Sequence, residues 1–297
     1  MRLFSLCGAV AAISVSYAGA ATNFVSSVSA YTPGNVFIAS GASYNQTASA
    51  IGPSSPIVGG GTVYAGILTP FNAHYGTDQL VVIGQGTGSI TMQFAAPVIV
   101  NAETKVGIYT NVAFEDVAFP VGGFSENARN YGFTEYSAER TAVVEVGDAA
   151  GNFVSLGRQV FDDPTNYYNN AASAYQYPAP ANPDFADFGK PYDGTASFNG
   201  LSLAQGIALL NGSAGGTWVT VPESVSIDVV TQIRISDTMW RLDDGTLVDQ
   251  RTSIYRPELY VKPADLFIDA AVAIPEPALL GLLACMSGLS LRRRVTR

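Results

Sequence analysis

Short apolar or alternating runs, separated by turn residues, fill most of the chain, and helix-type periodicity is scarce. Ile90, Met92 and Phe94 alternate with polar residues, which predicts a strand with one buried face, and Val225–Val229 alternates in the same way. Asp148–Asn152 separates two such runs and predicts a hairpin loop. The patterns predict strands at Thr62–Leu68, Gln79–Ile83, Ser89–Phe94, Lys105–Thr110, Val112–Phe119, Thr141–Val146, Phe153–Leu156, Gln159–Phe161, Thr217–Val221, Ser224–Ile235, Glu258–Lys262 and Leu266–Ile274.

Two stretches depart from this pattern. Residues 22–60 are rich in Ser, Ala, Gly and Thr, and we expect them to form a surface lead-in with one or two weak strands. Residues 162–200 are rich in Tyr and Asn, which predicts a long loop, and long loops are usually functional or mobile. A short helix is predicted at Leu203–Leu210, where apolar residues share one face. Many short strands with glycine-rich turns predict an all-β fold of the sandwich type.

The N-terminal residues have the layout of a secretory signal peptide. Arg2 precedes an apolar run, Leu3–Val15, and the small residues Ala18 and Ala20 form a cleavage site in front of Ala21. We therefore assign residues 1–20 to a signal peptide, handled by the Sec translocon and signal peptidase. The body of the protein is predicted to cross the inner membrane.

A second apolar run follows the last predicted strand. Pro275-Glu276-Pro277 precedes Ala278–Leu291, and Arg292-Arg293-Arg294 ends the run. Leucines cover all sides of a helix drawn through this segment, which favours a transmembrane helix over a packed amphipathic one. The run is shorter than the ~20 residues of a stable membrane span. The three arginines stand where the positive-inside rule places a cytoplasmic end. The pattern predicts a transient C-terminal membrane anchor.

Residues 272–297 resemble the PEP-CTERM sorting signal of Gram-negative bacteria. Pro275, Glu276 and Pro277 match the signature tripeptide of that family, and Arg292-Arg293-Arg294 matches its basic end. The resemblance implies that an exosortase removes the tail. It also implies delivery to the cell surface or to the extracellular polymer matrix.

Removal of both ends changes the charge of the protein. The chain has 15 basic and 24 acidic residues, and five of the basic ones and one acidic one lie in the two ends. The remaining body has ten basic and 23 acidic residues, a formal charge of −13, and it loses Cys7 and Cys285. A cysteine-free body cannot rely on disulfides. Its acidity argues against nucleic acid and anionic lipid as partners.

The body, residues 21–271, also resembles galactose-binding-like jelly-roll modules of exported bacterial proteins. The resemblance rests on a glycine turn with its strand (Gly84–Phe94), a hairpin (Val143–Val154) and two further strands, Ile233–Asp237 and Leu266–Ile274. It implies a jelly-roll-type β-sandwich, followed by the C-terminal hydrophobic sorting helix. The sequence departs from the family pattern at Ile268, at the extra small pair Ala270-Ala271 and in the 162–200 insertion.

Several acidic residues near the C-terminus of the body are candidate ligands for a structural Ca²⁺, which takes six to eight oxygen ligands. Asp243-Asp244-Gly245 is also an ordinary turn sequence, so both interpretations stay open. The candidates are Asp237, Asp243, Asp244, Asp249 and Asp269.

Evidence for enzymatic chemistry is sparse. His74 is the single histidine, it is expected in a surface turn, and no G-x-S-x-G motif accompanies it. A pair of carboxylates facing across a cleft would suit a carbohydrate-active hydrolase, and no motif marks such a pair among the scattered glutamates. Tyrosines of residues 162–200 could stack on sugars or cover the edge of the sheet. The sequence favours a non-enzymatic surface or matrix protein that contacts exopolysaccharide, with the hydrolase as the alternative.

Overall fold

The computed structural model describes residues 23–36, 44–58, 66–74, 76, 78–114, 116–118, 122–123, 129–130, 139–192, 197–242, 244–252, 261–263 and 266–274. The predicted signal peptide and sorting tail lie outside these residues. The strands are β1 (Asn23–Thr32), β2 (Ile57–Val58), β3 (Gly66–Ile67), β4 (Val81–Ile83), β5 (Ser89–Ile99), β6 (Lys105–Thr110), β7 (Ala113–Phe114), β8 (Arg129–Asn130), β9 (Glu139–Gly147), β10 (Phe153–Val160), β11 (Thr217–Thr220), β12 (Val229–Arg241), β13 (Leu247–Val248), β14 (Gln250–Thr252), β15 (Val261–Pro263) and β16 (Leu266–Ile274). The helices are α1 (Leu203–Leu210) and a 3₁₀ turn, η1 (Thr47–Ala50).

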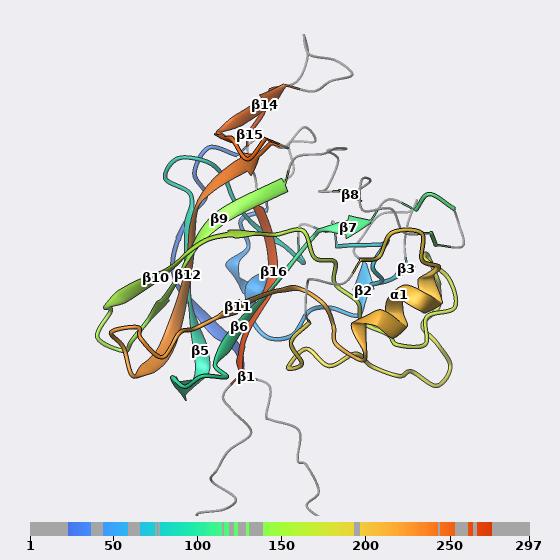
Figure 1. Cartoon of the computed structure of the whole chain (residues 1–297), viewed down its shortest axis with the longest axis horizontal. Helices are drawn as coiled ribbons and strands as arrows, with labels where there is room; N and C mark the ends of the chain where they lie inside the picture. The colour runs from blue at the N-terminus through green and yellow to red at the C-terminus, as the bar shows by residue number, and fades with distance from the viewer. Residues whose placement is uncertain are drawn as a thin grey trace, which may run out of the picture.

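Ten strands form one large antiparallel sheet, which confirms the predicted all-β class. Its order is β10-β9-β12-β5-β1-β16-β6-β11, with β13 beside β12 and β4 beside β16. The sheet curls into a nearly closed, barrel-like wall (Figure 1). Its two end strands come together where the Thr217 hydroxyl on β11 donates to the carbonyl of Val160 on β10, at 3.4 Å.

Strand β1 joins the two halves of this wall. Asn23 and Phe24 pair with β16, and the strand then pairs with β5 from Val25 to Thr32. Two register shifts along the β1–β5 pairing allow the strand to bend between its partners. The one or two strands expected in residues 22–60 are present as β1 and β2, but the expected place of a surface lead-in is wrong for β1, which lies in the middle of the sheet.

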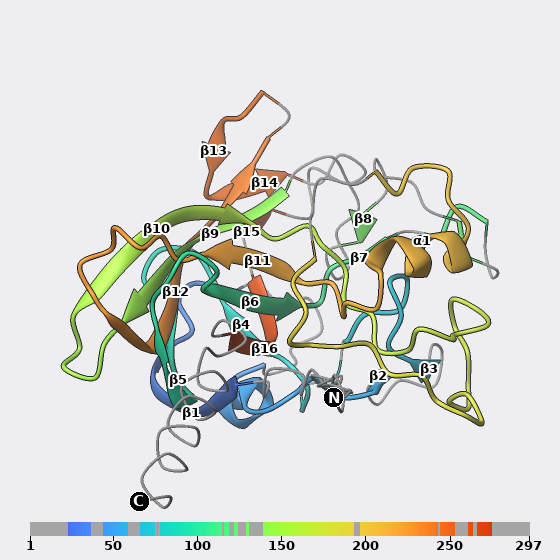
Figure 2. The same cartoon turned by 60° about the horizontal axis from the view of Figure 1, so that its bottom comes forward.

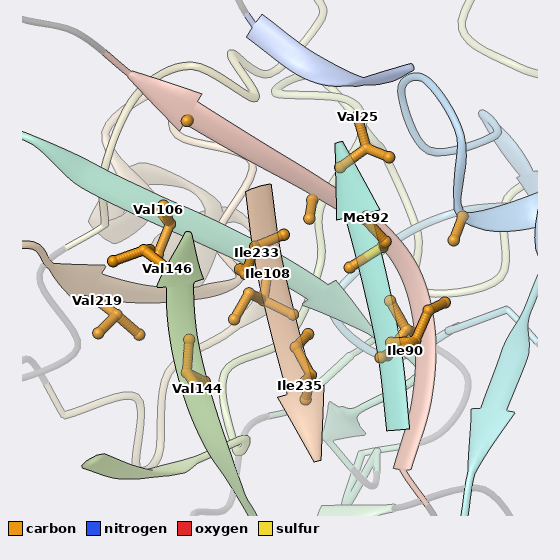
Figure 3. Packing of buried hydrophobic residues seen from close by; sticks show 14 of the residues in the cluster. Val25, Ile90, Met92, Val106, Ile108, Val144, Val146, Val219, Ile233 and Ile235 are labelled. Atoms are coloured by element: carbon orange, nitrogen blue, oxygen red, sulfur yellow. The ribbon is translucent and has the colours of Figure 1, made fainter. Parts of the chain in front are cut away.

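The inside of the barrel is aliphatic. Ile90, Met92, Ile108, Ile233 and Ile235, each 0% exposed, come from three strands and meet in one cluster. Figure 3 shows these side chains pointing toward one another between the strands. Each such side chain contributes roughly 1.5–3 kcal/mol on burial. The predicted buried face of β5 is confirmed.

The predicted strands differ in how well they match the structure. Lys105–Thr110 and Leu266–Ile274 have the predicted bounds, and α1 spans the predicted Leu203–Leu210. Ser202 begins α1 with a capping box, in which its hydroxyl and the side chain of Gln205 satisfy each other's backbone N–H groups. The segment from Ser224 to Asp228 is a turn and not a strand, and β12 begins at Val229.

An aromatic lobe, defined here as residues 66–72, 113–114, 162–192 and 197–216, packs on the outside of the barrel. Figures 1 and 2 place α1, β2, β3 and β7 together at one side of the wall. Residues 161–192 contain no strand or helix, in agreement with the predicted loop, but isolated bridges and backbone hydrogen bonds fix them. The interior of the lobe includes Phe71, Phe114, Tyr168, Tyr192, Phe198, Leu203, Ile207 and Leu210.

Candidate functional site

The candidate calcium ligands lie in different surroundings. The carboxylate of Asp237 on β12 is paired with Arg158 of β10, and Asp269 is buried in β16. Asp244 accepts the N–H of Thr246 in a turn, which lowers the pKa of Asp244, and Asp249 is exposed. Asp243 lies outside the described residues. Within the described part of the chain, no three His, Cys, Asp or Glu side chains are arranged to hold a metal ion.

Two of the scattered glutamates, Glu139 and Glu145, are bound to arginines. Glu145 Oε2 accepts from Nε of Arg234 at 2.5 Å, and Glu139 Oε2 accepts from Nε of Arg241 at 2.6 Å. Arg234 also lies over the ring of Phe153, 3.9 Å from its centroid. Both pairs join β9 to β12, so these carboxylates tie strands together on the sheet.

A cluster with the ingredients of chemistry surrounds His74. We call Ser54, His74, Gln79 and Asp269 the His74 cluster. His74 Nε2 lies 3.0 Å from the Ser54 hydroxyl and 3.6 Å from Asp269 Oδ2, and His74 Nδ1 lies 3.2 Å from Gln79 Oε1. His74 is 2% exposed, so the expectation of a surface turn is wrong. Ser54, Gln79 and the residues next to them, here called the covering segments, contact the imidazole, which lies against Asp269 of β16.

A β-bulge brings Asp269 into this position. Ile268 and Ala271 both face the barrel interior although they are three residues apart, and the register of β16 shifts between Ile268 and Ala270. Asp269 is the additional residue at that shift, and its carboxylate reaches His74 instead of the apolar interior.

Hydrogen bonds determine which nitrogen of His74 carries a proton. Gln79 Nε2 donates to the carbonyl of Ile57 at 2.5 Å, which leaves Gln79 Oε1 facing the ring. Nδ1 therefore donates to Gln79, and Nε2 is the atom that faces Ser54 and Asp269. Burial raises the pKa of the Asp269 carboxyl, and the charge of His74 and the Ser54 hydroxyl lower it in part. Asp269 thus binds a proton more readily than an exposed aspartate.

This geometry is not that of a serine hydrolase. In a catalytic triad the acid holds Nδ1 while the serine faces Nε2, whereas here Ser54 and Asp269 approach the same nitrogen. Ser54, His74 and Asp269 are only 2%, 2% and 3% exposed, so the cluster lies beneath the surface. Through the contacts of His74 with Ser54, Gln79 and Asp269, the His74 cluster places the covering segments against β16. Ser54 and Gln79 carried no motif that would have identified them from the sequence.

A second set of contacts fixes the aromatic lobe on the barrel. The Tyr109 hydroxyl on β6 donates to the carbonyl of Phe188 at 2.8 Å, and burial raises the pKa of Tyr109 well above its ordinary value. Trp218 meets the Tyr109 ring edge-on, with centroids 6.4 Å apart. Gly107 makes room for this indole, because a Cβ there would lie 2.8 Å from a ring carbon of Trp218. Trp218 therefore packs between β6 and the lobe.

The predicted sorting motif and cleavage site, including Ala21, lie outside the described residues. No helix in the described ranges is long and apolar enough to cross a membrane. No family model, curated protein or solved structure matches the chain.

Proposed function

We propose that the chain is an exported, non-enzymatic protein of the cell surface or extracellular matrix, sorted by a PEP-CTERM signal that an exosortase removes. One observation carries the proposal: Pro275-Glu276-Pro277, an apolar run and three arginines follow one another. Strand β16 ends at Ile274, directly before Pro275. Proline removes a ladder hydrogen bond, so the motif begins where pairing of the last strand stops. A processing enzyme would meet it just outside the folded body.

A jelly-roll-type β-sandwich is part of the same proposal. The sheet has two halves that share β1, namely β10-β9-β12-β5-β1 and β1-β16-β6-β11. Two antiparallel halves around one aliphatic interior are compatible with a jelly-roll-type sandwich whose halves remain joined along one side. The proposed C-terminal sorting helix would extend this body toward the membrane.

We further propose that the mature body contacts extracellular polysaccharide. Its composition is strongly acidic, and its aromatic lobe packs many rings together. The geometry of the His74 cluster and the arginine partners of Glu139 and Glu145 give no support to the alternative of a hydrolase.

The sorting proposal is tested by replacing Pro275, Glu276 and Pro277 with alanine in cells that contain an exosortase. We expect the variant to keep its tail and to remain in the inner-membrane fraction, because the processing enzyme no longer reads the motif. Mass spectrometry of the C-terminus and cell fractionation measure both effects. The matched control is Pro222→Ala with Glu223→Ala, which removes an exposed Pro-Glu pair from the body. An alanine variant with the same mature mass and destination as the control would refute the proposal.

A further inference from the structure

Phe185 is one of two strongly exposed rings in the described part of the aromatic lobe, with Tyr177 (68% exposed), and it is the one that rests on other rings of the lobe. It is 57% exposed, whereas Tyr168 and Phe188 beside it are 4% and 8% exposed. Its centroid lies 5.9 Å from that of Tyr167, edge-on, and 5.6 Å from that of Tyr168. The exposed ring therefore rests on two further rings.

The backbone around Phe185 is fixed as well. Phe185 forms a β-bridge with Tyr168, and the Ala186 N–H donates to the carbonyl of Tyr167 at 2.9 Å. The side chain of Asn169 donates to the carbonyl of Phe185 at 3.1 Å. Because the backbone under the ring is already held, binding of a ligand over the ring orders little additional backbone and costs little conformational entropy.

Polar residues flank Phe185 on this segment of the lobe. Asp184 is exposed, and its N–H donates to the side-chain oxygen of Asn170 at 3.1 Å. The amide of Asn170 donates in turn to the carbonyl of Asn182 at 2.7 Å, so the polar neighbours are also held in place. A fixed apolar ring next to hydrogen-bonding groups suits a sugar, whose C–H face is apolar and whose hydroxyls lie around its edge.

The charge of the body favours neutral polysaccharides over anionic ones. The mature body has a formal charge of −13, and Asp184 adds a negative charge next to the ring. Anionic polysaccharides would be repelled, whereas neutral ones would not.

We propose that Phe185 is the stacking residue of a binding surface for neutral polysaccharide, with Asp184 as an acceptor for sugar hydroxyls. This proposal rests on the proposed matrix function, because that function supplies the polysaccharide that the surface would meet. A surface with one ring binds each sugar weakly, so contact with a polymer depends on repeated units.

Affinity electrophoresis of the full chain in non-ionic detergent tests this site. The gels contain dextran, galactomannan or hydroxyethylcellulose as neutral probes, and alginate as the anionic probe. We expect at least one neutral polymer to slow the protein, and Phe185→Ala to weaken that binding about tenfold, as loss of one buried ring predicts. Phe185→Tyr keeps the ring and should keep binding, and Asp184→Asn should weaken it less. The matched control is Ile99→Ala, which removes another exposed apolar side chain (69% exposed) on β5.

Three results would overturn the proposal. They are no retardation by any neutral polymer, retardation by alginate alone, or equal binding of Phe185→Ala and Ile99→Ala. A native mass that rises with concentration and falls in Phe185→Ala would assign the ring to a contact between copies of the chain. These measurements do not depend on processing of the tail, so they can fail while the sorting proposal stands.

Discussion

The barrel interior and the aromatic lobe reach dense packing by different means. In the barrel, strands distant in sequence contribute Ile, Val and Met at alternating positions. In the lobe, aromatic rings and alanines pack between irregular segments, held by single backbone hydrogen bonds such as that from Asn166 N–H to the carbonyl of Ala214 at 2.9 Å. Strand pairing places many side chains at once, whereas the lobe requires a specific contact for each segment.

Strand β16 contacts both regions. Ile268 and Ala271 face the aliphatic interior, and Ala270 and Val272 lie against Tyr109 and the lobe. The small side chain of Ala270 allows the rings of the lobe to approach the strand closely. The strand thus links the stability of the lobe to that of the barrel, and three substitutions test how strong this link is.

The largest effect on the whole protein is expected from Ile235→Ala in the barrel. Ile235 is 0% exposed, and its truncation leaves a cavity that neighbouring strands cannot fill. We expect the free energy of unfolding to fall by about 2–5 kcal/mol, measured by denaturant titration. The exposed-site variant Ile99→Ala should change it by about 0.5 kcal/mol or less. Similar losses in both variants would contradict the assigned interior.

A smaller global effect is expected from Phe198→Ala in the lobe. Phe198 is 2% exposed, and its ring centroid lies 5.2 Å from that of Phe114 and 5.8 Å from that of Tyr192. Because single hydrogen bonds hold the lobe, it should open locally before the barrel unfolds. Hydrogen exchange should then accelerate at Asn166 and remain slow at Ile233 of β12. Equal acceleration at both positions would show that the two regions unfold as one unit.

The smallest change at neutral pH is expected from Asp269→Asn, since the amide keeps the size of the carboxyl and can still hydrogen-bond. Burial raises the pKa of Asp269 in the folded state, so the folded protein binds this proton more tightly than the unfolded chain. Its stabilising contribution is present below the ordinary pKa of an aspartate, about 4, and is lost as the pH rises through the folded value. The variant should therefore show a flatter dependence of unfolding free energy on pH in that window.

Asp148→Asn is the control, because the contribution of Asp148 to the unfolding free energy depends on pH in the opposite direction. The side chain and backbone N–H of Asn152 lower the pKa of Asp148, so its contribution is present above the ordinary value and is lost as the pH falls through the folded one. Parallel pH profiles for Asp269→Asn and the unsubstituted protein would contradict the assigned role of Asp269.

Local patterns predicted those elements whose signals lie within a few residues. The Asp148–Asn152 loop, α1 and the strand Leu266–Ile274 are of this kind. The bounds of strand β1 and its place in the middle of the sheet were not predicted, because most of its side chains are partly or fully exposed and its composition resembled that of a surface segment with weak strands. The segment before Val229 alternates like a strand yet forms a turn, since alternation does not show whether a pairing partner is present.

The sequence by itself determined the all-β class, the alternation that builds the barrel interior, the acidic charge of the body and the proposed sorting tail, because each depends on composition or on residues close together in the chain. Only the tertiary structure decided the order of strands, the packing of the lobe on β6 and β16, and the burial of His74. Ser54, His74 and Asp269 lie far apart in sequence, and a single-residue bulge in β16 brings the carboxylate to the imidazole. Such contacts depend on register and close packing, which local sequence patterns do not specify.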